Sequence, residues 1–320
     1  MSNNEEQDSG SVSDETEEFT DAVADKLLGE ITPVTEEVLA GFTEQDHFSH
    51  LAFDLYKETG ILLSVCAHLC TEEEANAAVI ERNHAICAGL LIRISKFTVA
   101  VTQLLATAER GKVVMALHRS VMESAINLRF LLFKNDNEVY QQFVQSSLAP
   151  ERELVDRIQE NIGKREKHEI WPIENRMLDS SQSTCRLSGV RIEDIGPRRG
   201  QWAGGMKERL KALGEEELYL FAERLPSHAV HGTWVDLLLH HLEPKNGGFM
   251  PDPSWSPTDP RLVCPVCLLI LPVLSPYLET FFPAVPETRA ICGRMVGLWQ
   301  RIHLLDQAHE AWMNKAETAS

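Results

Sequence analysis

The stretch that decides the fold is residues 112–133, KVVMALHRSVMESAINLRFLLF. Apolar side chains cover most of the circumference of this segment at helical spacing, which is typical of a helix at the centre of a bundle. Between residues 40 and 315, apolar residues recur with a helical period, and no segment alternates convincingly with a period of two. The sequence therefore predicts an all-α protein built as a multi-helix bundle.

The negative charge of the chain is concentrated at its beginning. Residues 1–38 contain twelve Asp and Glu against the single Lys26, and so carry −11 of the net charge of −18. Residues 1–19, dominated by Ser, Asn, Asp, Glu and Gly, cannot bury enough apolar surface to offset their ordering entropy. A short amphipathic helix is expected over residues 21–28, with Pro33 ending the region. We expect residues 1–38 to be a disordered acidic tail and residues 39–315 to be a single α-helical domain.

Residues 168–205 differ from the segments around them because Pro and Gly recur and the periodicity is weak. We expect an irregular connector here. From residue 164 to residue 211 there are eleven Lys and Arg against seven Asp and Glu, so this is the basic part of the chain. Arg198 and Arg199, together with Trp171 and Trp202, offer the charge and stacking surfaces that single-stranded nucleic acid binds. A solvated basic loop is the simpler interpretation of the same residues.

Several features indicate a cytoplasmic protein. Residues 1–20 lack the basic start and apolar run of a signal peptide. The apolar stretch 262–278 is short for a bilayer span and contains three prolines, which favours a kinked core helix over a membrane segment. The seven cysteines are odd in number and lie mostly within apolar patterns, which suits a reducing compartment.

The first candidate site lies on the central segment. Arg119, Glu123 and Asn127 are four residues apart and therefore share one helical stripe. On a buried helix such charges must be paired and hydrogen-bonded. Two interpretations are open: a structural ion pair between helices, or a polar pocket lined by these three side chains.

The second candidate site is the run 227–232, SHAVHG. Ser227 has the position of an N-cap for a helix that we expect to continue to about Leu242. His228 and His231 lie about one turn apart, and the positive end of a helix disfavours a protonated imidazole. His231 is thus a candidate general base, and structural histidines are the alternative.

No metal or cofactor is expected. Cys264 and Cys267 have the spacing of half a zinc site, and Cys66 and Cys70 offer further thiols, but no second well-spaced pair completes the set. The sequence also lacks a phosphate-binding Gly loop, a Gly-x-Ser-x-Gly elbow and a His-Glu-x-x-His motif.

The run 117–132, LHRSVMESAINLRFLL, resembles the central Arg-Ser-x-x-Glu helix of DUF5677, a large bacterial family of helical proteins of unknown function. The run 227–232 resembles the second signature of that family, Ser-x-x-x-His-Gly. The resemblance covers roughly residues 80–245. It implies a helical bundle in which Arg119, Glu123, Ser227 and His231 approach one another.

A further similarity is to HEPN domains, helical bundles that many prokaryotic RNases of toxin and defence systems use. Their hallmark is an Arg followed after four to six residues by a His, and Arg224 and His231 fit that count. The resemblance implies a metal-independent endoribonuclease that acts on RNA as a homodimer. His231 would be the acid or base, Arg119 or Arg224 would stabilise charge on the phosphate, and Glu123 would orient the arginine. The alternative is a non-catalytic binding protein in which these residues form a structural polar network.

Overall fold

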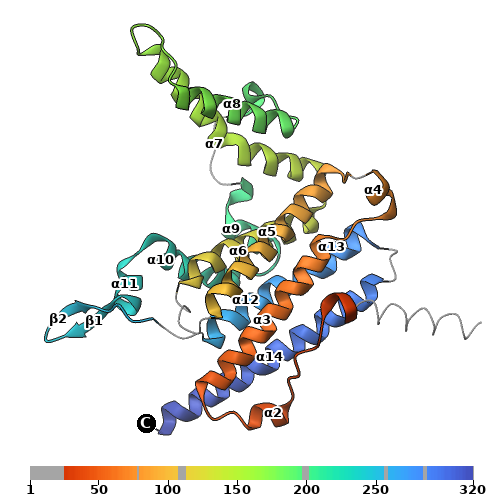
Figure 1. The fold of residues 1–320 in the computed structure, drawn as a ribbon, viewed down its shortest axis with the longest axis vertical. Helices are drawn as coiled ribbons and strands as arrows, with labels where there is room; N and C mark the ends of the chain where they lie inside the picture. The colour runs from red at the N-terminus through yellow and green to blue at the C-terminus, as the bar shows by residue number, and fades with distance from the viewer. Residues whose placement is uncertain are drawn as a thin grey trace, which may run out of the picture. The chain divides into compact units, whose positions relative to one another are not determined.

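The computed structural model describes residues 25–77, 79–106, 113–196, 202–255, 259–283 and 287–319 (Figure 1). The α-helices are α2 (Glu36–Ala40), α3 (Gln45–Ala67), α4 (Glu72–Ala77), α5 (Arg82–Leu105), α6 (Val114–Lys134), α7 (Asn137–Gly163), α8 (Pro172–Leu187), α9 (Met206–Ala212), α10 (Leu225–His231), α11 (Trp234–His240), α12 (Pro260–Ile270), α13 (Leu274–Phe281) and α14 (Glu287–Ala319). Short 3-10 turns are η1 (Ile192–Asp194), η2 (Trp202–Gly204), η3 (Glu216–Leu218) and η5 (Leu271–Val273), and η4 (Leu220–Arg224) is a π-helical turn. The predicted all-α class is confirmed.

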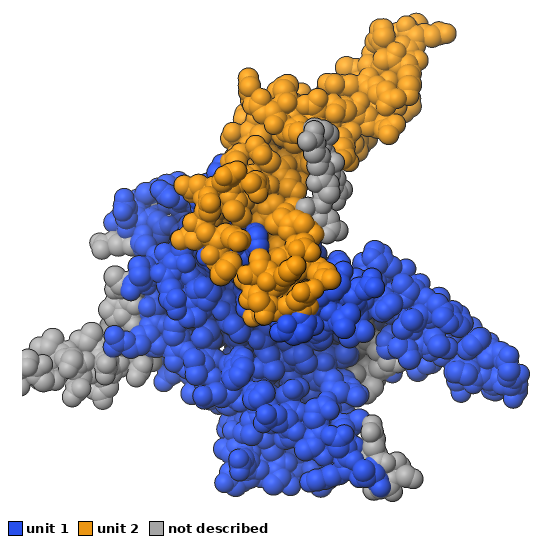
Figure 2. Space-filling view, turned by 180° about the vertical axis from the view of Figure 1, so that it is seen from behind, with its two compact units in different colours: residues 1–132, 217–320 blue, residues 133–216 orange. Residues whose placement is uncertain are grey.

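The chain divides into two compact units (Figure 2). Unit 1 comprises residues 1–132 and 217–320, and unit 2 comprises residues 133–216. The expectation of a single domain over residues 39–315 remains a prediction, and the two units are described separately below.

Helix α3 organises the core of unit 1, because it packs against α5, α12, α13 and α14. Gly60 permits the close approach of α3 and α5: a Cβ at this position would lie 2.9 Å from Cγ2 of Thr98. Helix α6 is buried around most of its circumference, with Val121, Met122 and Ile126 fully inaccessible to solvent. The central position predicted for this segment is confirmed.

Residues 25–38 correct the predicted tail. Residues 1–24 lie outside the described part of the chain, but Leu28 and Val34 are buried in unit 1 and α2 begins at Glu36. Thr35 caps α2 by accepting a hydrogen bond from the backbone N–H of Val38. Residues 25–28, the described part of the short helix expected over residues 21–28, are helical, and the last third of residues 1–38 contains the apolar side chains needed for packing.

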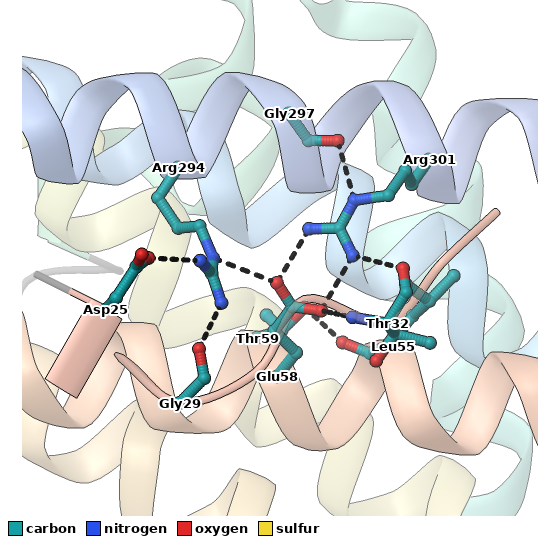
Figure 3. A network of polar contacts seen from close by, with 9 residues as sticks. All are labelled: Asp25, Gly29, Thr32, Leu55, Glu58, Thr59, Arg294, Gly297 and Arg301. Atoms are coloured by element: carbon teal, nitrogen blue, oxygen red, sulfur yellow. Dashed lines mark hydrogen bonds and ion pairs between the residues drawn. The ribbon is translucent and has the colours of Figure 1, made fainter. Parts of the chain in front are cut away.

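A buried carboxylate explains how residues 25–32 are held (Figure 3). Glu58 on α3 is 6% exposed and accepts hydrogen bonds from both Nη atoms of Arg301, at 2.6 and 2.8 Å. It also accepts from Nε of Arg294 at 3.3 Å and from the backbone N–H of Thr32 at 3.2 Å. Burial raises the pKa of Glu58, but Arg301, with help from Thr32 and Arg294, outweighs burial, so the pKa lies below its ordinary value.

The two arginines also bind the N-terminal segment directly. Arg294 donates to Oδ1 of Asp25 at 3.0 Å and to the backbone carbonyl of Gly29 at 2.5 Å. Arg301 donates to the carbonyl of Thr32 at 2.7 Å. The Glu58 network therefore joins α3, α14 and residues 25–32, which are far apart in the sequence (Figure 3).

Unit 2 contains the segment predicted to be an irregular connector, and that prediction is wrong for residues 172–187. These residues form α8, with Pro172 at its first position and Glu174 accepting a hydrogen bond from the backbone N–H of Trp171. Helices α7 and α8 pack on each other, and a small core contains Leu148, Cys185 and their neighbours. Packing against α7 stabilises a helix whose own apolar pattern is weak.

The one sheet in the described residues is a hairpin that the sequence analysis missed. Strands β1 (Leu242–Lys245) and β2 (Gly248–Pro251) pair antiparallel across Asn246 and Gly247. Both turn residues have positive φ, 52° and 79°, as a type I′ turn requires. The Asn-Gly dipeptide was the signal available in the sequence, since the strands are too short to alternate visibly.

Two helical segments are long and apolar enough to cross a membrane, α5 and residues 260–281. In each, much of the apolar window is buried inside the protein, 44% for α5 and 61% for residues 260–281. Core helices meet the same criterion, so the predicted absence of a membrane span and the predicted location remain predictions. The 3-10 turn η5, which contains Pro272, interrupts the second segment as its prolines indicated.

We predict that Glu58→Gln lowers the free energy of unfolding by about 3–5 kcal/mol at pH 7, because it leaves Arg301 without a carboxylate and Arg294 with only the exposed Asp25. The folded pKa is below the unfolded value of about 4.3, so the contribution of Glu58 is complete above that pH. It declines as the pH falls through the folded pKa. Urea unfolding from pH 7 to pH 3 should show the difference between wild type and variant shrinking below pH 4.

Glu160→Gln is the matched control. Lys164 lowers the pKa of Glu160 as well, but both side chains of this pair are exposed on α7. Solvent screens such a pair, so no measurable loss of stability is expected. Equal effects of the two substitutions would contradict the role assigned to Glu58.

Candidate functional site

Arg119 on α6 joins the two sequence signatures. Its Nη2 donates to Oε1 of Glu223 at 2.8 Å, and its Nε donates to Oγ of Ser227 at 3.2 Å. The arginine side chain is only 18% exposed, so these charge-assisted hydrogen bonds lie in a partly desolvated setting. The guanidinium thereby ties α6 to the helical run that contains η4 and α10, and all three residues belong to unit 1.

Glu223 is the residue of this network that the sequence analysis missed. It lies in the π-helical turn η4, immediately before α10. The hydroxyl of Ser227 donates to the backbone carbonyl of Glu223, four residues earlier. The sequence did contain a signal for this contact, since Glu223 and Ser227 are four residues apart. That spacing predicts a contact only when residues 220–231 are helical throughout. Single π-helical turns are frequent at functional sites.

Glu123 and Asn127 continue the stripe along α6. Oε2 of Glu123 is 3.9 Å from Nη1 of Arg119, a looser pair whose glutamate side chain is 45% exposed. Oδ1 of Asn127 is buried and has no hydrogen-bond partner among the described residues. The predicted stripe is therefore present, but Glu223 rather than Glu123 is the principal partner of Arg119.

Two expectations about the run 227–232 are wrong. Ser227 does not cap a helix, because α10 begins at Leu225 and follows η4 without a break in helical backbone angles. The helix also ends at His231, since Gly232 is left-handed with φ of 55°, and α11 begins only at Trp234. His231 thus lies in the last turn, where the argument from the positive end of a helix does not apply.

The histidines of α10 have different surroundings. Nδ1 of His228 is 2.7 Å from Oγ1 of Thr233, a contact that spans the turn between α10 and α11. His231 is exposed, and no hydrogen bond or ion pair involves it within the described part of the chain. Arg224 is exposed in the same way and has no such partner there.

Arg224, the last residue of η4, and His231, the last residue of α10, lie on one face of a continuous helical run. They are seven residues apart, which is close to two helical turns, and Arg224 has helical backbone angles at the start of the helix. Their side chains start about 10 Å apart along the axis. A flexible arginine and an imidazole at this separation are able to converge on one phosphate group.

The basic candidates of unit 2 are partly accounted for. Arg165 lies over the ring of Trp171 at 3.8 Å and pairs with Glu174. Trp202 packs edge-on against Phe143. Both tryptophans are thus engaged within unit 2, while Arg198 and Arg199 lie outside the described residues.

The cysteines proposed as half a zinc site are packed in the core. Cys264 and Cys267 are both buried on α12, and burial raises the pKa of the Cys267 thiol to about 12. A thiol of this kind is a poor metal ligand. Within the described ranges no group of three or more His, Cys, Asp and Glu side chains is placed to hold a metal ion.

Comparison with known proteins gives one match. A family model described as Family of unknown function (DUF5677) matches residues 84–249, from the first turn of α5 to β2. This span includes Arg119, Glu223, Ser227 and His231. No curated protein and no solved structure matches the chain.

We predict that Arg119→Ala lowers the free energy of unfolding by about 1.5–3 kcal/mol, because Glu223 loses a charged donor in a partly buried position. The measurement is urea denaturation followed by circular dichroism at 222 nm. Arg191→Ala is the control, since Arg191 pairs with Asp194 on the exposed surface and should cause no measurable change. If Arg119→Ala were as harmless as the control, the network would not fix α6 to α10.

Proposed function

The chain belongs to DUF5677, a family of unknown function, and we propose that it is a metal-independent endoribonuclease of a toxin or defence type. The proposal places the reacting groups on the continuous helical run from η4 through α10. One observation carries it: Arg224 and His231 share an exposed face of this run, and neither has a hydrogen-bond or ion-pair partner among the described residues.

The pairing of residue types supports a reaction on a phosphodiester. The 2′-hydroxyl of RNA is a nucleophile already positioned beside the scissile phosphate, so the enzyme need only move protons and stabilise charge. His231 takes the proton of the 2′-hydroxyl as the oxygen attacks phosphorus. The bond from phosphorus to the 5′-oxygen breaks, that oxygen takes a proton from solvent water, and the products are a 2′,3′-cyclic phosphate and a 5′-hydroxyl. Arg224 stabilises the negative charge that grows on the phosphate.

Arg119 has a different role in this proposal. Its guanidinium is bound by Glu223 and Ser227, so it is not available as a free cation for a phosphate. It acts instead as a positioning residue that fixes the helical run from η4 through α10. Because α10 has only seven residues, contacts outside the helix must set its orientation. Glu123, Asn127 and His228 lie beside this network or on α10 and are proposed to border the bound RNA.

A non-catalytic binding protein is the second candidate. The observation in its favour is that the guanidinium of Arg119 already donates hydrogen bonds to Glu223 and Ser227. A structural polar network requires such internal partners. In that case Arg224 and His231 would be ordinary surface residues. The two candidates make different predictions for His231, since a surface histidine has no effect on activity when it is removed.

We predict that the purified full-length protein cleaves mixed cellular RNA in EDTA and that His231→Ala lowers the rate at least 100-fold, the scale of general acid–base catalysis. Its melting temperature should stay within about 1 °C of wild type, because the side chain is exposed and without a partner. His50→Ala is the control, an exposed histidine on α3 with no partner among the described residues.

The products identify the reaction. The 2′,3′-cyclic phosphate end can be detected by ligation that depends on that end group. Arg224→Ala should also slow cleavage strongly without affecting stability. Intact RNA with the wild-type protein, or equal cleavage by wild type and His231→Ala, would rule out the enzyme as proposed and favour the binding protein.

A further inference from the structure

We propose that residues 225–255, here called the arm, form a docking surface for a second copy of this chain. The arm consists of α10, α11 and the β1–β2 hairpin, which follow one another in teal in Figure 1. Only Pro226 and Asp236 in it are buried. The proposal concerns the association of the protein and is independent of whether it cleaves RNA.

The arm exposes far more apolar surface than its size explains. Six large apolar side chains in it are at least half exposed: Leu225 57%, Trp234 54%, Leu239 62%, Phe249 50%, Met250 52% and Trp255 60%. Taking half of the about 150–250 Å² of an aromatic side chain for each, the six present roughly 600 Å² in total. These side chains come from α10, α11, β2 and the residues that follow β2, and exposed apolar side chains gathered in one part of a chain are typical of interaction surfaces.

The secondary structure of the arm also lacks internal support. Helix α11 has seven residues and each strand has four. A helix this short and an isolated two-stranded hairpin are marginal in water. Within the arm α11 packs on α10 and β1 and contacts β2 through Trp234, so covering its apolar face would stabilise the arm itself as well as the complex.

An aromatic pair marks the centre of this surface. The rings of Trp234 on α11 and Phe249 on β2 pack edge to face, with centroids 5.2 Å apart. Both rings remain half exposed after this contact. Exposed aromatic side chains that are already held in place are typical of the residues that dominate binding energy at interfaces.

The edge of β2 favours a second copy as the partner. The backbone N–H of Asp252 donates to the carbonyl of His241 at 2.8 Å, which fixes the alternation of the ladder. From the register Pro244↔Phe249, the N–H and C=O of Phe249 then point away from β1. Two β2 strands related by a two-fold axis can pair antiparallel at Phe249, which brings the two Trp234–Phe249 pairs together.

The size and charge of the arm agree with this partner. The roughly 600 Å² that these six side chains expose in total is a large part of the about 800 Å² that each partner contributes to a standard interface. Pro251 has no N–H, so strand pairing is short and the side chains supply most of the contact. A membrane surface is disfavoured because the arm has Lys245 against Asp236, Glu243 and Asp252, whereas surfaces that bind anionic lipid are basic.

The test measures the mass of the full-length protein without RNA, by light scattering after gel filtration between 1 and 100 µM. The wild type should be a dimer, and Phe249→Glu should weaken dimerisation by roughly 30-fold or more, the effect of removing a central interface residue. Leu187→Glu is the matched control: this leucine is 83% exposed at the end of α8, outside the arm, and its substitution should leave the dimer intact. A wild-type monomer throughout the range would overturn the proposal, as would unchanged dimerisation of Phe249→Glu.

A second variant covers the case in which Phe249→Glu misfolds. Residues paired across the proposed axis have Cα atoms about 5.5 Å apart, a distance that a disulfide spans. Because Cys70 is exposed, the test is made in a Cys70→Ser background. There, oxidised Phe249→Cys should form covalent dimers, while the background protein and its Leu187→Cys variant should not. Absence of this cross-link in a dimeric protein would place the interface elsewhere.

Sedimentation of a monomeric wild type with phosphatidylcholine vesicles would identify a bilayer as the occupant and refute the dimer. Because no outcome depends on RNA cleavage, failure here is distinct from failure of the proposed function.

Discussion

The carboxylate of Glu58 lies in the core of unit 1, and a buried carboxylate is tolerated only when charges and donors surround it. Arg294 and Arg301 meet that requirement from α14, more than 230 residues away in the sequence. Their remaining donors then bind the carbonyls of Gly29 and Thr32. One electrostatic constraint therefore fixes the position of α14 on α3 and holds the N-terminal segment. Since α3 also packs on α5 and α12, much of unit 1 is built around the helix that carries this charge.

The contrast between α6 and residues 25–38 shows what the sequence could predict about the fold. The apolar residues that cover most of the circumference of α6 are a local pattern, and a helix of this kind is stable only when it is buried in a core. The order of residues 25–32 depends instead on Arg294 and Arg301, and no local pattern contains that information. The charge composition predicted disorder for these residues instead. Asp25 adds to the negative charge of the segment, and the sequence does not show that Arg294 pairs with it. The prediction of an irregular connector failed at α8 for a similar reason, because packing against α7 stabilises this helix.

The candidate site was predictable in its membership and less so in its geometry. Arg119 and Ser227 were identified from the sequence, and their side chains are in contact. The role of Ser227 was misjudged because a serine before an apolar run resembles an N-cap only if the preceding residues are not helical. Here the π-helical turn η4 precedes it, and that turn carries Glu223 to Arg119. The sequence also did not predict where α10 ends. A glycine is compatible with a helix interior and with the left-handed termination that Gly232 adopts.

Helix α10 connects the network, the proposed catalytic face and the arm. Its Ser227 accepts a hydrogen bond from Arg119. The face that bears His231, together with the preceding Arg224, is exposed. Its C-terminal end leads through Gly232 into α11. A seven-residue helix has little intrinsic stability, so its orientation is set by what binds it at either end. The Arg119 network supplies one such contact, and under the proposed docking the arm supplies the other. The positions of Arg224 and His231 would then depend on both, which provides a physical route by which association of two chains could tune the geometry of the reacting groups.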